Sequence, residues 1–174
     1  YSGVRQGAVV SPLLANLYLH PFDQSMVAQG FGLVRYADDF VLCCRERAEA
    51  VRALERCTSF LHERLHLRLN PNPQPIRPVE EGFGFLGIWF AGPRRTVAEA
   101  KIDGARGRLQ ALVAAGAPGR DILRQINECA AGWRRYYGVI VEDADLEPLE
   151  ALVCEAATAV VARERRSGRC STAE

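Results

Sequence analysis

The amino-acid sequence predicts an α+β fold in which an antiparallel sheet backed by helices is followed by an all-α segment. Two features carry this prediction. Short apolar and aromatic runs bounded by turn residues, the pattern of hairpin strands, occur within residues 1–91. From residue 92 onward helix-forming residues dominate, with short breaks that contain glycine or proline. The composition, 48% hydrophobic and 25% charged residues, suits a globular protein.

The chain has 174 residues, enough for one substantial domain or for a domain with an appendage. It contains no run of about 18 apolar residues, so no transmembrane helix is expected. It begins Tyr-Ser-Gly-Val-Arg-Gln-Gly, without Met and without the layout of a signal peptide. We therefore expect a fragment whose beginning is missing.

The six cysteines follow no regular spacing and include no CxxC pair. This spacing supports neither a zinc site nor a disulfide framework. We expect them to be small buried apolar residues of a protein in the reducing cytoplasm.

The first half of the chain is expected to hold two helices and a tight hairpin. Ser11 as N-cap and Pro12 in the first turn predict a helix that runs to about residue 28. The segment 34–42 is typical of two short strands whose tip carries Asp38 and Asp39. A second helix is expected over 47–65, with an inward face at three- and four-residue spacing formed by Val51, Leu54, Thr58, Leu61 and Leu65.

The second half is expected to begin after a rigid connection. Residues 67–69 alternate like a brief strand, and the prolines of 70–75 exclude helix and central strand. The aromatic run 83–90 has glycines where the chain must bend, which predicts a second hairpin or a bulged strand pair. After a boundary at 91–93, helices are expected at about 98–115, 119–137 and 146–166.

Asp38 and Asp39 are the first candidate functional residues. Two adjacent carboxylates repel each other unless a cation lies between them, and oxygen ligands on a rigid turn suit Mg²⁺. The alternative is a solvated turn in which both residues merely favour the backbone geometry. The neighbouring motifs favour the metal site.

His62-Glu63-Arg64-Leu65-His66 fits the HExxH pattern of zinc proteases, with two histidines one helical turn apart. A catalytic zinc needs a third protein ligand, which only His20 or a loop glutamate, Glu80 or Glu81, could supply. The helix is also expected to end before His66. A zinc protease is therefore a minor alternative.

The glycines at 82, 84 and 87 match the dinucleotide fingerprint GxGxxG. That motif requires a helix that begins at its last glycine and offers its N-terminus to a pyrophosphate. Here the glycines lie in a strand-like aromatic run, so we expect no dinucleotide site.

Five further motifs follow one another in order: Gln6-Gly7, Ser11-Pro12-Leu13-Leu14-Ala15-Asn16, Tyr36-Ala37-Asp38-Asp39, Leu69-Asn70-Pro71 and Phe85-Leu86-Gly87. Together they resemble the consecutive blocks of a reverse transcriptase of the bacterial group II intron type, from the middle of the palm to its end. The later run Gly132-Trp133-Arg134-Arg135-Tyr136-Tyr137-Gly138 resembles the start of the maturase-specific region of intron-encoded proteins. The resemblance extends to about residue 160.

The resemblance implies an RNA-directed DNA polymerase, a nucleotidyltransferase of a bacterial mobile element. Residues 1–91 would be a partial palm, 92–118 a thumb helix, 119–166 a maturase-type segment and 167–174 a loose tail. The family's third metal-binding aspartate would lie upstream, so we expect this chain alone to be inactive. A non-catalytic RNA-binding or splicing module, and a reverse transcriptase of a CRISPR adaptation system, are open alternatives.

The resemblance also implies roles for single residues. Asp38 and Asp39 would hold two Mg²⁺ ions about 3.5–4 Å apart, together with the missing upstream carboxylate. The contacts with nucleotide and template would come from Gln6, Gly7, Ser11, Pro12, Tyr36 and Ala37. The primer end would be positioned by Phe85, Leu86 and Gly87. A core position for Tyr36 and a plain helix cap for Ser11 and Pro12 are the alternatives.

The chain departs from the family pattern at three places. Arg5 stands where a proline usually precedes Gln-Gly. Asn72-Pro73-Gln74 follows Asn70-Pro71 in place of a Glu-Lys-Thr-like sequence, so the family's basic residue is absent there. His66 stands where glycine is common, which makes the zinc motif a coincidence.

The net charge of +1 hides a basic segment at 92–138, where nine basic residues against four acidic ones give +5. Such a segment suits a nucleic-acid backbone, here an RNA template, a DNA primer or intron RNA, although a solvated helix face is the alternative. The candidate backbone contacts are Arg106, Arg108, Arg120, Arg124, Arg134 and Arg135. Trp133 falls in register with Ile122 and Ile126, which favours a buried anchor over a base-stacking residue.

Overall fold

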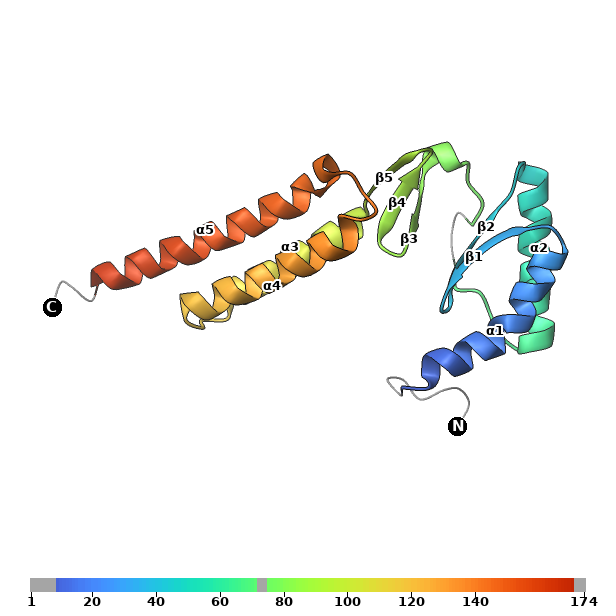
Figure 1. Ribbon diagram of the computed structural model, residues 1–174, viewed down its shortest axis with the longest axis horizontal. Coiled ribbons are helices and arrows are strands. Elements are labelled where there is room, and N and C mark those ends of the chain that lie inside the picture. The colour runs from blue at the N-terminus through green and yellow to red at the C-terminus, as the bar shows by residue number, and fades with distance from the viewer. Residues whose placement is uncertain (1–8, 72–74, 171–174) are drawn as a thin grey trace. The chain divides into compact units, whose positions relative to one another are not determined.

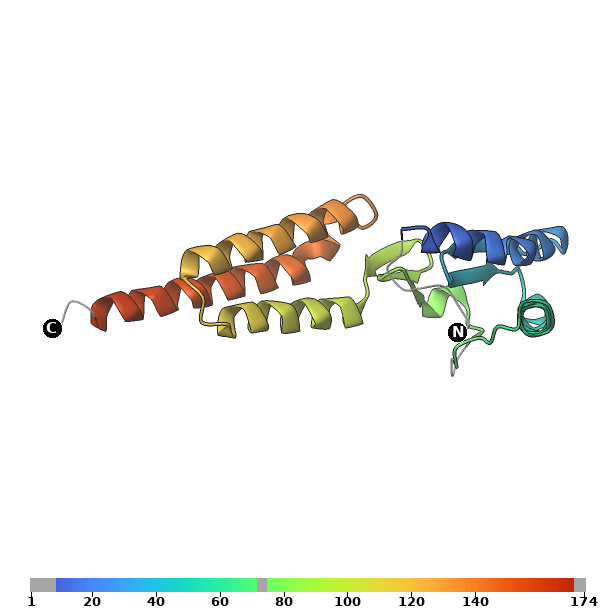
Figure 2. The same cartoon turned by 90° about the horizontal axis from the view of Figure 1, so that it is seen from below.

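The chain forms two compact units, residues 1–78 and 79–174, in the computed structural model shown in Figure 1 and Figure 2. The structure describes residues 9–71 and 75–170, of which 167–170 are described by their backbone alone. Each unit has its own hydrophobic core. The mixture of helices with small antiparallel sheets agrees with the predicted α+β class.

The first unit consists of a hairpin between two helices. α1 (Ser11–Ala28) leads into β1 (Gly32–Tyr36) and β2 (Asp39–Cys43), which pair antiparallel, and α2 (Arg47–Leu65) follows. Gly30 has a φ of 84° and lets the chain reverse after α1 without strain. Both predicted helices and the predicted hairpin are confirmed.

The core of the first unit lies where one face of the hairpin meets both helices. Its buried side chains are Phe22 and Met26 from α1 and Cys57, Leu61 and Leu65 from α2. Its partly buried strand residues are Leu33, Phe40 and Leu42. The rings of Phe22 and Phe40 lie 5.1 Å apart between centroids, which joins α1 directly to β2, the strand that begins at Asp39.

The start of α1 differs from the prediction. Val10, not Ser11, occupies the N-cap position, and no side-chain cap bond forms there. Pro12 lies in the first turn as expected, where its missing N–H costs no hydrogen bond. A second proline, Pro21, lies inside the helix, and α1 nevertheless continues to residue 28.

The inward face of α2 is rotated relative to the predicted one. Ala53 and Cys57, each 1% exposed, lead a buried stripe that repeats every fourth residue to the end of the helix. Val51 and Thr58 are exposed instead. Leu61 and Leu65 are buried as predicted, whereas Val51 and Thr58 were wrong because the prediction weighted side-chain size and small residues here allow close packing. No strand forms at 67–69.

The second unit begins with a three-stranded sheet. After the short 3-10 helix η1 (Val79–Glu81), the strands β3 (Phe83–Phe85), β4 (Ile88–Ala91) and β5 (Arg94–Val97) form an antiparallel meander with β4 in the centre. The expected hairpin is confirmed, whereas β5 was not predicted. The expected boundary at 91–93 is thus the turn between two strands of one sheet.

Three long helices follow the sheet. They are α3 (Glu99–Ala114), α4 (Gly119–Tyr137) and α5 (Glu147–Cys170), and the 3-10 helix η2 (Asp143–Leu146) precedes the last of them. They pack against one another, and Figure 2 shows all three lying side by side. All three were predicted, and α5 continues four residues into the segment that we expected to be a loose tail.

The sheet and the three helices of the second unit share one core. Ile88 and Val97 on the sheet join the same buried cluster as Leu109 of α3, Ile126 of α4 and Val160 of α5. The partly buried Trp133 packs against this cluster. Trp133 therefore faces the core, as predicted, but its side chain is half-buried and not fully buried.

A pair of neighbouring residues on α5 holds the loop between α3 and α4. Arg163 donates from Nη1 to the carbonyl of Val113 at 3.1 Å and from Nη2 to the carbonyl of Ala117 at 2.7 Å. Glu164 accepts the N–H of Gly119 through Oε1 at 3.0 Å. The cation thus lies at the end of α3 and the anion at the start of α4, where the helix dipoles favour them.

The cysteines do not form the buried set that we expected. Cys57 is buried, but Cys43 and Cys154 are exposed, and these three are free thiols, as are Cys44 and Cys129. Within those ranges no helix has the length and hydropathy needed to cross a membrane.

Candidate active site

The tip of the β1–β2 hairpin is a two-residue turn formed by Ala37 and Asp38. Tyr36 pairs with Asp39 across it, which fixes the register of the hairpin. Ala37 has a φ of 55°. A positive φ at the first turn position alone is the pattern of a II′ turn, where glycine is usual. An alanine there stores backbone strain, and strained turns are concentrated at functional sites.

The outward face of the hairpin carries the residues next to the turn. Tyr36 and Asp39 share this face with Val34 and Val41, because side chains alternate along each strand and Phe40 belongs to the core face. Tyr36 is 68% exposed and Val34 is 52% exposed. The core position considered for Tyr36 is therefore wrong, and the strand next to the acids presents an uncovered aromatic and aliphatic surface.

Asp38 and Asp39 are both exposed, one in the turn and one at the first position of β2. Their carboxylate oxygens are the donors that Mg²⁺ prefers. No third acidic, histidine or cysteine side chain of the described ranges joins them in a group that could hold a metal. The donor set fits Mg²⁺ in kind, and it is incomplete in number.

The HExxH pair is not presented by one helical face. His62 lies in the last turn of α2, whereas His66 is the C-cap residue and has a left-handed φ of 52°. This places the second histidine beyond the regular helix, as the sequence predicted.

Arg35 connects the acidic turn to α1. Its Nε and Nη2 donate to the two carboxylate oxygens of Asp23 at 2.7 and 2.5 Å. Its Nη1 donates to Oδ1 of Asn16 at 2.9 Å and to the carbonyl oxygen of Ala37 at 2.7 Å. The hydrogen bonds with Asp23 raise the pKa of the Arg35 guanidinium above its ordinary value.

A family model described as reverse transcriptase (RNA-dependent DNA polymerase) matches residues 1–90, which is more than half of the chain. The chain belongs to this reverse transcriptase family. The matched range contains the acidic turn with Asp38 and Asp39 and also the turn with Leu86 and Gly87. The resemblance drawn from the sequence motifs is thus confirmed at the level of the family.

One curated relative is Protein YkfC of Escherichia coli (strain K12). The two sequences are 31% identical over a match that covers 58% of the chain described here and 35% of YkfC. The chain therefore spans about a third of the length of that relative.

The structure describes only some of the residues that the sequence resemblance assigns to nucleotide and template contacts. Gln6 and Gly7 lie outside the described residues. Ser11 begins α1 and Pro12 is exposed in its first turn. The described members of the set, Ser11, Pro12, Tyr36 and Ala37, all belong to the first unit.

The expected primer-positioning residues lie in the second unit: Phe85 ends β3, and Leu86 and Gly87 form the two-residue turn between β3 and β4. Leu86 has a φ of 52° and Gly87 a φ of 83°, the two positive values that a type I′ turn requires. The phenol of Tyr136 donates to the carbonyl oxygen of Leu86 at 2.9 Å. A Cβ on Gly87 would lie 3.2 Å from Cε of Lys101 and 3.3 Å from the phenol oxygen of Tyr137. The turn is therefore held from α3 and α4.

The expected backbone-contacting arginines are all exposed on α3 and α4. Some of them form exposed ion pairs: Arg106 with Asp103 at 2.6 Å, Arg124 with Asp121 at 3.7 Å, and Arg134 with Glu150 at 3.5 Å. Exposed pairs of this kind contribute little stability and exchange readily with other anions. The buried face of α4 contains Ile122 and Ile126, so Arg120, Arg124 and Arg135 lie on the opposite, solvent face.

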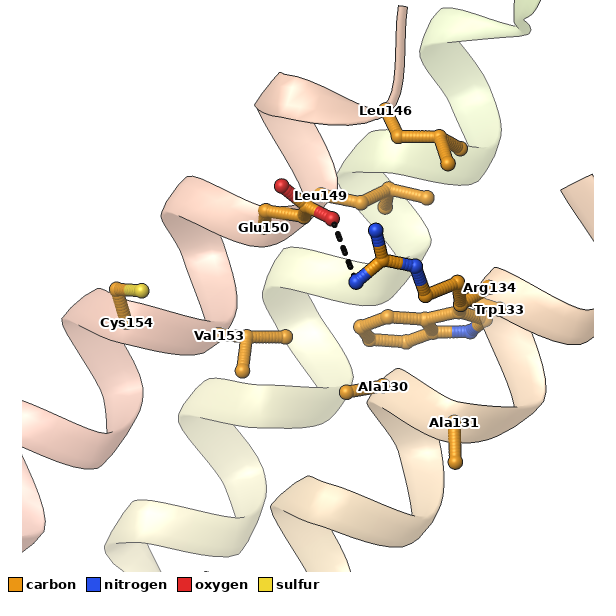
Figure 3. Close-up of a pocket in the computed structure, with 9 residues that line it drawn as sticks. All are labelled: Ala130, Ala131, Trp133, Arg134, Leu146, Leu149, Glu150, Val153 and Cys154. Atoms are coloured by element: carbon orange, nitrogen blue, oxygen red, sulfur yellow. Dashed lines mark ion pairs between the residues drawn. The ribbon is translucent and has the colours of Figure 1, made fainter. Parts of the chain in front are cut away.

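A groove of about 430 Å³ lies between α4 and α5. Figure 3 shows Trp133 and Val153 along its apolar wall and the ion pair of Arg134 with Glu150 above it. The pair satisfies both charges, and the remaining lining is mostly apolar. The groove therefore lacks the converging carboxylates or cations that phosphoryl chemistry needs, and the hairpin stays the candidate active site.

The sequence interpretation missed two features of the site. Arg35 was not singled out, although a charged residue in register with Leu33 on the core face of a strand is a signal that it needs a buried partner. The bond from Tyr136 to Leu86 joins residues 50 positions apart and carries no local signal.

Proposed function

We propose that this chain is the metal-binding and primer-positioning part of an RNA-directed DNA polymerase that transfers dNTPs to a primer on an RNA template. The observation that carries the proposal is the strained turn at Ala37 that presents Asp38 and Asp39 to solvent within a chain of the reverse transcriptase family. The first unit and the sheet would form the palm, and α3 would belong to the thumb.

In this proposal Asp38 and Asp39 hold Mg²⁺ together with a carboxylate from elsewhere in the parent protein. The metal, when bound, activates the primer 3′-hydroxyl and stabilises the pyrophosphate leaving group. Such transfer asks the protein for positioning and electrostatics rather than for covalent chemistry. Tyr36 offers its exposed ring beneath the last base pair of the primer, on the same face as Asp39.

The arginines of α4 would hold the duplex or a structured RNA through its phosphates. Contacts of this kind set position and carry no sequence information. The maturase-like run that contains Trp133 and Tyr136 favours a group II intron-encoded parent over a CRISPR-associated one. Within that parent the same helix face would also bind intron RNA.

The experiment is primer extension by the complete parent protein on an RNA template, with and without Mg²⁺. We expect DNA synthesis that requires Mg²⁺ and that Asp38→Asn and Asp39→Asn each abolish while RNA binding remains. Primer extension by both variants at the wild-type rate would show that Asp38 and Asp39 take no part in the reaction. A wild-type protein that binds RNA and extends no primer would favour the non-catalytic RNA-binding alternative.

A further inference from the structure

Arg35 is the residue that ties the acidic turn to the helix beneath it. It lies on the core face of β1, yet its guanidinium reaches α1 and makes four hydrogen bonds. Its side chain is 11% exposed. A guanidinium that is partly covered in this way is favoured where hydrogen bonds engage its N–H groups, and four such bonds are present here.

The bond to Ala37 acts on the backbone that carries Asp38. Because the peptide unit is planar, the carbonyl of Ala37 and the N–H of Asp38 move as one rigid group. The 2.7 Å bond from Nη1 of Arg35 therefore fixes the orientation of the backbone from which the Asp38 carboxylate projects. Ala37 holds its φ of 55° only if its surroundings support it.

Asp23 and Asn16 in turn fix the guanidinium. Asp23 accepts two parallel bonds, a fork that arginine can provide and lysine cannot. Asn16 accepts from the same Nη1 that reaches Ala37, so this nitrogen is held between α1 and the turn. An ion pair that served stability alone would need Asp23 and would not need the bond to the turn.

We infer that Arg35 is a positioning residue that orients the Asp38 carboxylate for metal binding, with Asn16 and Asp23 as its anchors on α1. This inference rests on the proposed function, because it assigns Arg35 to the same reaction. The inference goes beyond the proposed function because it states that a side chain outside the acidic pair, Arg35, sets the conformation of the turn.

The test compares Arg35→Lys with Arg52→Lys in the complete protein. Arg35→Lys keeps the charge next to Asp23 and loses the fork and the reach to Ala37. Arg52 is the matched control, since it lies on α2 in the same unit, 61% exposed, with Glu46 at 4.0 Å. The readouts are the Mg²⁺ midpoint and rate of single-nucleotide incorporation, the KM for primer–template, and hydrogen exchange of residues 32–43 without metal or nucleotide.

We expect Arg35→Lys to raise the Mg²⁺ midpoint or lower the rate roughly 10- to 100-fold, as loss of the partners of metal ligands does. The KM for primer–template should stay unchanged and the hairpin should exchange faster. A role in stability alone would lower the melting temperature without moving the Mg²⁺ midpoint. Arg35→Lys that matches Arg52→Lys in midpoint, rate and hairpin exchange would overturn the inference.

Asn16→Ala decides the question if Arg35→Lys does not fold, because it leaves the Asp23 fork in place. We expect a smaller shift in the same direction, and wild-type metal dependence and exchange would overturn the inference. If the wild-type protein extends no primer, the proposed function fails. Hydrogen exchange of the hairpin then still decides whether Arg35 orders the turn.

Discussion

Tyr136 in the last turn of α4 donates a hydrogen bond of 2.9 Å from its phenol to the carbonyl oxygen of Leu86 in the β3–β4 turn. Tyr136 and the adjacent Tyr137 pack edge to face, with centroids 4.9 Å apart, and Tyr137 lies next to Gly87. The run 132–138 and the motif Phe85-Leu86-Gly87 are therefore in direct contact. The C-terminal end of α4 holds the turn that is proposed to position the primer.

Tyr136→Phe should slow nucleotide incorporation by the complete protein while leaving its fold intact. The variant removes one hydrogen bond of about 1 kcal/mol, which corresponds to a roughly fivefold lower rate if the whole bond acts on turn geometry. Tyr18→Phe is the matched control, since its phenol donates to the carbonyl of Leu65 at 2.6 Å, at the end of α2. Equal incorporation rates for the two variants would show that the hydrogen bond of Tyr136 plays no part in positioning the primer.

Glu164→Ala should destabilise the second unit through the start of α4. It removes the acceptor of the Gly119 N–H and an anion from the positive end of the helix dipole. Loss of such a cap costs about 1 kcal/mol, equivalent to a fall in melting temperature of roughly 4–8 °C for a unit of this size. Glu155→Ala, exposed on the same helix, is the control. Equal melting temperatures would show that water replaces the cap.

The cysteines should differ in reactivity according to burial. Burial raises the pKa of the Cys57 thiol from 9.0 to about 11, so at pH 8 it is protonated as well as inaccessible. Iodoacetamide should label the exposed Cys43 and Cys154 first and Cys57 only on unfolding, as peptide mass mapping would show. Rapid labelling of Cys57 in the native protein would contradict the packing of α2 described above.

The same shift in pKa predicts a dependence of stability on pH. Above pH 9 the unfolded chain loses the Cys57 proton while the folded chain keeps it, so the unfolded state is favoured increasingly up to about pH 11. Well below pH 9 the Cys57 thiol is protonated in both the folded and the unfolded state, so it adds no pH dependence to the stability. Cys57→Ala should therefore lose less stability than the wild type between pH 9 and 11 in urea unfolding. Identical losses would contradict the raised pKa.

The solvent face of α4 should contribute to the salt dependence of RNA binding. Replacing Arg120, Arg124 and Arg135 by alanine removes up to three phosphate contacts, each worth roughly 0.7–0.9 in the log–log slope against salt concentration. Arg52→Ala on α2 is the control. A triple variant with the wild-type slope would show that these arginines form an ordinary solvated helix face.

Much of the fold was predictable because its signals are local. The breaks before Gly119 and after Tyr137 define both ends of α4, and short apolar and aromatic runs on either side of the acidic pair define the hairpin around Asp38. The strand β5 escaped prediction because Arg-Arg-Thr-Val is too short and too polar to stand out, and its pairing with β4 decides its conformation.

The candidate site divides in the same way. Asp38 and Asp39 could be found from adjacency and turn chemistry, since both signals lie within one short segment. The anchors Asn16 and Asp23 could not, because they reach the turn through Arg35 from a helix 12 to 19 residues away. Which helix face meets which strand is a property of packing that local sequence does not encode.

The most direct test of the central claim is metal-dependent primer extension by the complete protein with Asp38→Cys. A thiolate is a poor ligand for Mg²⁺ and accepts softer ions such as Co²⁺ or Cd²⁺. If Asp38 binds the metal of the reaction, extension in Mg²⁺ falls by at least about 100-fold, and the softer ions restore part of it. Asp143→Cys, exposed in η2, should behave as the wild type in every metal. Wild-type extension by Asp38→Cys in Mg²⁺ would contradict the assignment of this hairpin to the polymerase active site.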